Sequence, residues 1–128
     1  MKILGIDFGT KNVGISISDD EGRVAFLRVT QKRDEHIVSY IVDMREKEGV
    51  ETVVLGMPQN IPERWKEDIE EFKKELEQKG LKVVFQDESF SSHEAHHSAH
   101  QFGIKTVTDS SAAAIILQRY LDRESNKA

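Results

Sequence analysis

The chain has 128 residues, of which 38% are hydrophobic and 32% are charged, a composition typical of one soluble globular domain. No stretch approaches the roughly 20 consecutive apolar residues of a membrane-spanning helix, so no membrane role is expected. The lack of cysteine excludes disulfides and thiolate metal sites, and the net charge of −5 argues against a protein that coats nucleic acid through bulk positive charge.

Positive charge is concentrated in the N-terminal part of the chain, because residues 1–33 carry a net charge of +2 and residues 34–128 a net charge of −7. Any electropositive surface is therefore expected near the first segment, although ordinary solvated side chains explain the same residues equally well. The cations concerned are Lys11, Arg23, Arg28, Lys32 and Arg33. Gly5 and Asp7 interrupt the apolar core that a secretory signal would need, which favours a cytoplasmic protein.

Five strands are predicted by short apolar runs and by apolar residues that alternate along the chain. The turn sequence DDEG joins the second and third strands as a hairpin, and the run TVVLG is typical of a strand covered on both faces. The predicted strands are residues 2–7, 13–18, 23–30, 52–56 and 81–86.

Helices are predicted where apolar residues recur every three or four positions. They are expected from Ile37 to Gly49, from about Trp65 to Gly80, from a capping box at residues 91–94, and from Asp109 to Asp122.

The order of these elements predicts one α/β domain over residues 1–122. An antiparallel meander of three strands leads into alternating helices and strands, which require a parallel portion in the same sheet. Residues 123–128 are predicted to form a frayed tail.

Four of the five histidines are clustered, and three residues of the cluster form an H-E-x-x-H sequence. This spacing puts two zinc ligands on one helix face, with a glutamate as general base. A third ligand on the same straight helix would lie about two turns away, roughly 10 Å, whereas zinc bonds are near 2 Å. We therefore interpret the cluster as a polar helix face with adventitious metal affinity, and Glu94 as the capping-box acid. The four histidines are His93, His96, His97 and His100.

Acidic residues stand at the ends of three predicted elements. Asp7 ends the first strand, Asp87 and Glu88 follow the fifth, and Asp109 begins the last helix. The carboxyl ends of parallel strands form the crevice where open α/β sheets bind ligands. Each acid also has a structural explanation, since Asp109 suits a helix N-cap and strand-end acids are often only solvated. Asp7 is the hardest to explain in this way, because an acid at the end of a central strand is costly unless it is paired or metal-bound.

Two or three carboxylates without cysteine form a hard oxygen site that suits Mg²⁺ or Mn²⁺. Two such ions held roughly 3.5–4 Å apart activate water and stabilise the attacking and leaving oxygens of a phosphodiester. The residues alone therefore predict metal-dependent phosphate chemistry.

Four segments of the chain resemble the YqgF/RuvX family of the ribonuclease H-like superfamily. They are GIDFGTKNVGISISD, VVLGMPQN, DESFSSHEA and DSSAAAIILQRYL. The family patterns are D-x-G-x-K-x-x-G-x-A/S, G-x-P, D-E-R-x-S/T-S/T-x-x-E-A and D-x-x-A-A-x-x-I-L-Q-x-Y-L. The likeness spans nearly the whole chain in the family's order, so it is far more specific than the histidine match.

The resemblance implies a ribonuclease H-like fold of five strands with helices on both faces, and metal-dependent cleavage of nucleic acid. The substrate that the resemblance implies is the 5′ end of precursor 16S ribosomal RNA rather than branched DNA, and the implied cofactor is Mg²⁺ or Mn²⁺. The implied catalytic residues and metal ligands are Asp7, Glu88 and Asp109. The implied phosphate contacts are Thr10 and Lys11, with Ser91 and Ser92 as weaker candidates.

The chain also departs from the family pattern. Ser89 stands where the family usually has arginine, and the stretch before Asp109 offers only His100 and Lys105 as basic residues. Fewer phosphate contacts predict weaker and less salt-sensitive binding, and hence a reduced or partner-dependent activity.

Three other functions stay open. A Holliday junction resolvase would use the same carboxylates but needs a dimer to cut two strands symmetrically. An accessory protein would bind nucleic acid with weak catalysis. A nucleotide-binding domain of the actin and sugar-kinase type has a similar GIDFGT loop but needs two such domains. The choice between monomer and dimer, and a need for a ribosomal partner, also stay open.

Overall fold

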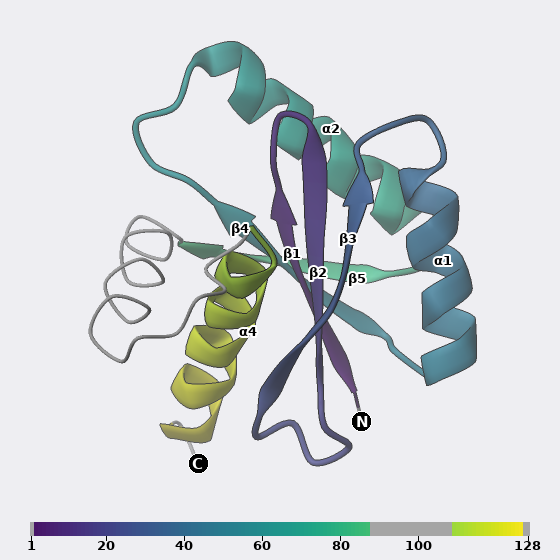
Figure 1. The fold of residues 1–128 in the computed structure, drawn as a ribbon, viewed down its shortest axis with the longest axis vertical. Coiled ribbons are helices and arrows are strands. Elements are labelled where there is room, and N and C mark those ends of the chain that lie inside the picture. Colours follow the sequence, from purple (N-terminus) through teal and green to yellow (C-terminus); the bar gives the residue numbers. More distant parts are fainter. Residues whose placement is uncertain (1, 88–108, 127–128) are drawn as a thin grey trace.

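One mixed sheet of five strands organises the structure (Figure 1). The computed structural model describes residues 2–87 and 109–126. Its strands are β1 (Ile3–Phe8), β2 (Asn12–Ser18), β3 (Ala25–Lys32), β4 (Thr52–Met57) and β5 (Lys82–Asp87). Its helices are α1 (Ile37–Glu48), α2 (Glu63–Gln78) and α4 (Asp109–Asn126). Within these residues, no helix is both long enough and apolar enough to cross a membrane.

The strand order β3-β2-β1-β4-β5 combines two kinds of pairing. β1 pairs antiparallel with β2, and β2 pairs antiparallel with β3, as expected for consecutive strands joined by short turns. β1 pairs parallel with β4, and β4 with β5, across helical connections. The predicted fold class, a three-strand meander continued by parallel strands, is confirmed.

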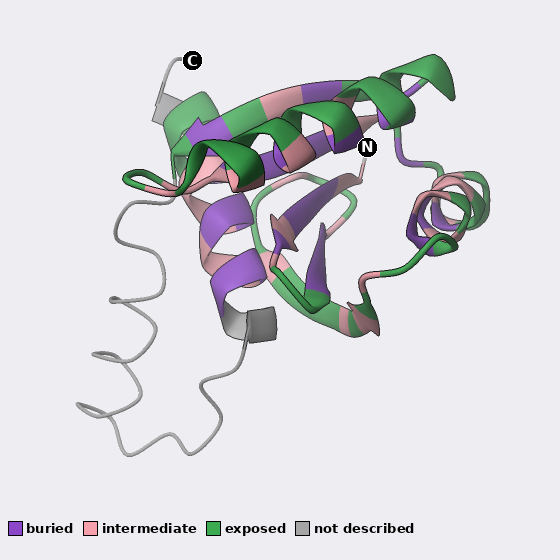
Figure 2. Ribbon diagram, turned by 90° about the horizontal axis from the view of Figure 1, so that it is seen from above, coloured by how far each residue is buried: buried purple, intermediate pink, exposed green. Residues whose placement is uncertain are grey.

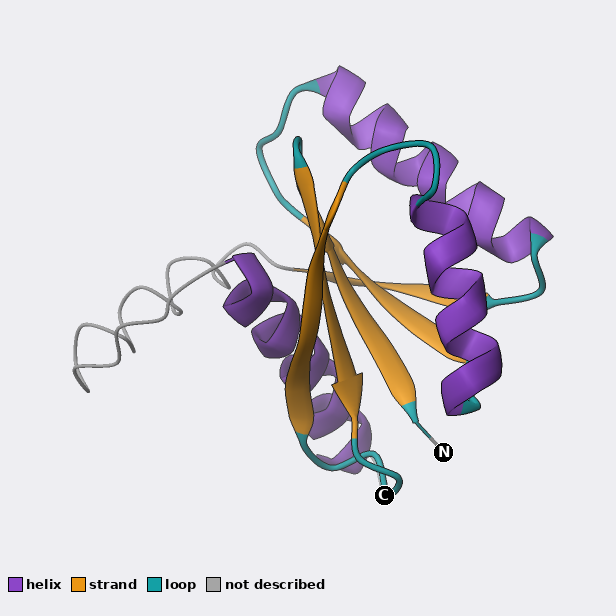
Figure 3. Ribbon diagram, turned by 45° about the vertical axis from the view of Figure 1, so that its right-hand side comes forward, coloured by secondary structure: helices purple, strands orange, loops and turns teal. Residues whose placement is uncertain are grey.

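Helices cover both faces of the sheet (Figure 3). The buried side chains of β1 alternate, so that Leu4, Ile6 and Phe8 belong to the core beneath α1 and α2, whereas Ile3 packs with residues of α4. We call these two sides of the sheet the α1/α2 face and the α4 face.

Buried residues lie on both sides of the sheet (Figure 2). Among the described residues, the cluster on the α1/α2 face is larger than the cluster on the α4 face. On the α1/α2 face, Ile41 of α1 and Ile69 and Leu76 of α2 are fully buried against the strands. On the α4 face, the smaller core consists of Val54, Ile116, Leu117 and Leu121. Burial of these apolar surfaces is the main favourable contribution to folding.

The predicted turn between β2 and β3 is held by Asp19. Its Oδ1 accepts hydrogen bonds from the backbone N of Arg23 at 2.7 Å and of Val24 at 3.1 Å. These two bonds stabilise the carboxylate and lower the pKa of Asp19 below its usual value. Gly22 closes the turn with a left-handed φ of 70°, which glycine adopts without a steric cost.

The last helix is longer than predicted. α4 continues to Asn126, whereas we expected it to end at Asp122, so residues 123–126 are helical rather than frayed. The sequence RESN contains no helix breaker, and Arg123 in the last turn interacts favourably with the helix dipole. The helix predicted to begin at residues 91–94 lies outside the described residues.

Candidate active site at the carboxyl edge of the sheet

Asp7 lies at the carboxyl end of β1, the middle strand of the sheet, opposite Gly14 of β2. Its side chain is partly buried, and the alternation along β1 places it on the α4 face, two residues beyond Gly5. Because β1, β4 and β5 are parallel, their carboxyl ends share this edge of the sheet.

α4 packs unusually closely on β1 because Gly5 has no side chain. A Cβ atom at Gly5 would lie 2.5 Å from Ser16 Oγ, 2.6 Å from Leu117 Cβ and 3.2 Å from Ala113 O. The buried Ser16 hydroxyl donates a hydrogen bond of 2.8 Å to Ala113 O, which joins β2 to the second turn of α4. The sheet and the helix are therefore in direct contact beside Asp7.

The direction of α4 brings its first residue towards Asp7. Further along α4, Gln118 contacts the β2–β3 hairpin, which pairs with the amino end of β1, so α4 runs opposite to β1 (Figure 1). From Ala113 back to Asp109 the helix rises about 6 Å, and from Gly5 to Asp7 the strand rises roughly 6.6 Å. The amino end of α4 therefore reaches the level of Asp7.

The turn that follows Asp7 is held by the α1/α2 side of the molecule. Gly9 N donates to Asn12 O at 2.9 Å, and a Cβ at Gly9 would lie only 2.6 Å from that oxygen. Trp65 Nε1 donates to Phe8 O, and Arg33 Nη1 donates to Gly9 O, both at 3.3 Å. These hydrogen bonds hold both ends of the turn, and between them Thr10 and Lys11, the implied phosphate contacts, are exposed.

Fewer of the N-terminal cations can form an electropositive surface than the charge distribution predicts. Arg23, Arg28 and Arg33 each form an ion pair, with Glu21 at 3.3 Å, Glu48 at 2.7 Å and Asp68 at 2.9 Å respectively. Lys11 and Lys32 are exposed and form no ion pair within the described residues. Two of the five cations are thus available to an external anion.

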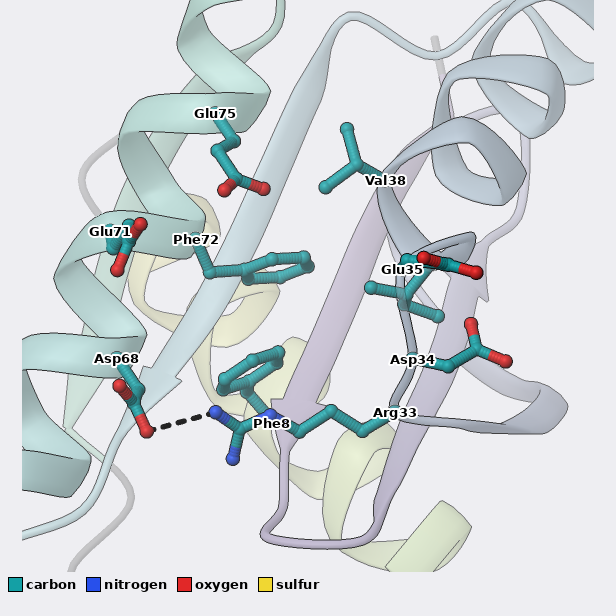
Figure 4. Close-up of a pocket in the computed structure, with 10 residues that line it drawn as sticks. Phe8, Arg33, Asp34, Glu35, Val38, Asp68, Glu71, Phe72 and Glu75 are labelled. Atoms are coloured by element: carbon teal, nitrogen blue, oxygen red, sulfur yellow. Dashed lines mark hydrogen bonds and ion pairs between the residues drawn. The ribbon is translucent and has the colours of Figure 1, made fainter.

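A cavity of about 420 Å³ lies between α1 and α2 (Figure 4). Phe8 lines it, so it is on the α1/α2 face, whereas strand alternation places Asp7 on the α4 face. Its floor includes Phe8 and Phe72, whose stacked rings are 4.3 Å apart, and Arg33 lies over the Phe8 ring. Its acidic lining residues are Asp34, Glu35, Asp68, Glu71 and Glu75. Apart from Arg33, which is paired with Asp68, the charged lining repels phosphate and disfavours nucleic-acid binding in this cavity.

Comparison with known families identifies the chain. Residues 1–123 match the RuvX family, which is described as a Holliday junction resolvase family. The chain belongs to the RuvX family. Relatives include proteins named "Putative pre-16S rRNA nuclease" from Clostridium perfringens and Staphylococcus aureus. The first is 34% identical over 139 residues, covering 98% of this chain and 99% of the relative, and the second is 36% identical over 135 residues, covering 94% and 95%.

Solved structures show that this RuvX chain has the fold of RuvC-like resolvases. Thermus thermophilus RuvC in complex with a Holliday junction substrate superposes with a TM-score of 0.68 at 15% identity, covering 100% of this chain and 98% of RuvC. The Fowlpox virus resolvase in complex with Holliday junction DNA gives a TM-score of 0.53 at 18% identity, covering 99% and 97%. The predicted ribonuclease H-like fold is thereby confirmed.

The structure places only part of the implied site of the RuvX chain. Asp7, Thr10 and Lys11 are described, and Asp109 is the first residue of α4, although its side chain lies outside the described part. Glu88, Ser91 and Ser92, together with Ser89 and the histidine cluster, also lie outside it. Among the described residues, no group of three or more His, Cys, Asp or Glu side chains fits a metal ion. The carboxylate triad of this RuvX protein therefore stays a prediction.

Sequence reasoning missed the residues that position α4 in this RuvX chain. Ser16 joins β2 to α4, and Gln118 joins α4 to the hairpin through Ala25 N and Arg23 O, both at 2.9 Å. A weak signal was present for each, because Ser16 stands between two isoleucines in VGISIS and Gln118 follows three apolar residues in IILQRYL.

Proposed function

We propose that the protein is a divalent-metal-dependent nuclease that hydrolyses phosphodiester bonds at the 5′ end of precursor 16S ribosomal RNA. The observation that carries this proposal is the close packing of α4 on β1 at Gly5, which brings the amino end of α4 level with Asp7. Membership of the RuvX family and the names of the relatives support the substrate class. Such a role in RNA maturation fits a cytoplasmic protein.

Asp7, Glu88 and Asp109 would hold the metal, and their oxygen donors fit Mg²⁺ or Mn²⁺. Val84 packs on the α4 face, so strand alternation puts Gln86 on that face as well. Gln86 Oε1 is buried, and no described residue donates a hydrogen bond to it. A buried acceptor without a donor suits a nearby hydrated cation.

The bound metal would activate a water molecule and stabilise the leaving oxygen. The chain's own residues orient the substrate. The Lys11 ammonium group would neutralise a phosphate beside the scissile bond, and the Thr10 hydroxyl would donate a hydrogen bond to a phosphate oxygen. The hydrogen bonds from Trp65 and Arg33 hold the turn in place before the substrate binds, so little order is lost on binding.

The decisive test is cleavage of an end-labelled precursor 16S RNA with Mn²⁺, Mg²⁺ or EDTA. Asp7→Asn is expected to lower the cleavage rate at least about 100-fold, a loss comparable to that of one electrostatic contact at a reacting group. The matched control is Asp43→Asn, because Asp43 is an exposed carboxylate on α1. Equal metal-dependent cleavage by the wild type and Asp7→Asn would refute the proposal.

A second candidate function is Holliday junction resolution, which the description of the family favours. It requires two copies of the site, related by a twofold axis, that nick opposite strands. A labelled four-way DNA junction incubated beside the RNA distinguishes the two functions, because symmetrical nicks without RNA cleavage support the resolvase. Binding of either substrate without cleavage points to an accessory protein or to a missing ribosomal partner.

A further inference from the structure

Lys32, the last residue of β3, lies on the same sheet face as Asp7. β3 pairs with β2, so that Lys32 is opposite Asn12 and Thr30 is opposite Gly14, and Gly14 is in turn opposite Asp7. Residues directly opposite in antiparallel strands share a face. Ser16, two residues beyond Gly14 on β2, bonds to α4, which identifies this row as the α4 face.

The next residue, Arg33, has a different environment. It bonds to Asp68 of α2 at 2.9 Å and lies 4.3 Å from the centre of the Phe8 ring, on the α1/α2 face. Side-chain alternation at the end of β3 therefore puts Lys32 and Arg33 on opposite faces of the sheet. Arg33 serves the internal structure, whereas Lys32 extends into solvent on the face of the candidate active site.

Lys32 and Lys11 form a pair of like charges without a counter-charge in the described residues. They are neighbours, because Asn12 is opposite Lys32 and Arg33 N donates to Lys11 O at 2.8 Å. Each arginine of the same segment has a carboxylate within 3.3 Å. A phosphate beside either ammonium group would form charge-assisted hydrogen bonds with it.

We propose that Lys32 is a further substrate-binding residue, which contacts a backbone phosphate of the nucleic acid other than the one that Lys11 contacts. The inference rests on the proposed nuclease function. β3 is two strands from β1, about 10 Å across the sheet, so Lys32 contacts a different phosphate from the one beside Asp7. This contact compensates in part for the sparse basic residues before Asp109.

The test measures the affinity for a labelled precursor 16S RNA fragment as a function of salt, in Asp7→Asn protein so that the RNA is not cut. Lys32→Gln is expected to reduce the slope of log affinity against log salt by about 0.7, the value for one single-strand phosphate contact. Lys32→Arg is expected to keep the slope. The control is Lys82→Gln, because Lys82 is an exposed lysine at the opposite, amino end of β5.

The outcomes separate this inference from the proposed function. An unchanged slope in Lys32→Gln, with metal-dependent cleavage by the wild type, overturns the role of Lys32 alone. A reduced slope without any cleavage by the wild type retains Lys32 as a nucleic-acid contact and overturns a nuclease function that needs no partner. An equal reduction in Lys82→Gln shows a general charge effect and overturns the specific contact, and a parent that binds no RNA overturns both proposals.

Discussion

Gly5 has no side chain at the point where α4 crosses β1, and this determines how near the helix comes to Asp7. A methyl group there would overlap Leu117 Cβ, which is bonded directly to the backbone, and Ser16 Oγ, which is held by its hydrogen bond to Ala113 O. Because interiors are close-packed, the overlap can be relieved only if α4 shifts away from the sheet. The position of one glycine thus affects the separation between the amino end of α4 and Asp7.

Gly5→Ala is expected to lower the free energy of unfolding by about 1–3 kcal/mol, as overpacking does in other cores. It should also lower nuclease activity in conditions where the variant stays folded, because Asp7 and the amino end of α4 move apart. Urea denaturation and the cleavage assay measure the two effects. Gly22→Ala is the control, since nothing lies within 4 Å of that site and its left-handed φ makes the substitution strained without touching α4.

At the scale of single residues, the sequence predicts which side chains are reactive better than it predicts which side chains contact each other. Asp7 stands out because an acid follows an apolar strand, and its place at the end of β1 is confirmed. The hydrogen bond from Ser16 to Ala113 joins residues 97 positions apart, so no local pattern indicates it. The pairing of Arg33 with Asp68 likewise depends on how α2 folds back over the turn, and sequence reasoning treated Arg33 as a surface charge.

β3 is an edge strand, and α4 covers part of its edge with one side chain. The Gln118 amide accepts a hydrogen bond from Ala25 N and donates one to Arg23 O, both at 2.9 Å, as a peptide group of a neighbouring strand would. Edge strands left with unpaired backbone groups are prone to pair with other chains. Gln118 therefore fastens α4 to the hairpin and protects this edge.

Gln118→Met keeps the size of the side chain but removes these hydrogen bonds. We expect the free energy of unfolding to fall by about 1–3 kcal/mol, the cost of leaving partly buried backbone groups without partners. The Ala25 amide should also exchange hydrogen faster, while amides of β1 keep their protection relative to global unfolding. Gln59→Met is the control, because Gln59 is exposed and bonds only to Asp87 among the described contacts. Unchanged exchange at Ala25 would contradict the role of Gln118.

The end of a helix can be predicted from the sequence only where a residue stops the helix. α1 ends at Gly49, as predicted, because that glycine adopts a left-handed φ of 72° that stops the helix. α4 passes the expected end at Asp122 because no comparable residue follows.

The described part of the molecule has two cores that share the same central strands. Leu4 and Ile6 of β1 and Leu55 of β4 pack under α1 and α2, while Val54 of β4 packs under α4. The fold class was predictable because the order of strands and helices limits the topologies that an α/β chain can adopt. The division of the described core residues between the two faces was not, because a continuous apolar strand such as TVVLG does not indicate which helix covers each face.

Because β1 and β4 serve both cores, we expect the molecule to unfold in one cooperative transition. Leu117→Ala on the α4 face and Leu55→Ala on the α1/α2 face should each lower the free energy of unfolding by about 2–5 kcal/mol. Trp65, the only tryptophan, packs against the α1/α2 core, so its fluorescence reports on that side, while far-UV circular dichroism reports on all helices.

The two signals should share one midpoint in both variants. In Leu117→Ala, a loss of helix before any change in Trp65 fluorescence would show that α4 detaches alone and would contradict the shared core. Leu27→Ala is the control, because the Leu27 side chain is 54% exposed and its truncation should change stability by no more than about 0.5 kcal/mol. The turn that carries Thr10 and Lys11 is held by α2, on the other face of the sheet from α4. If unfolding is a single transition, a substitution under α4 nevertheless destabilises this turn.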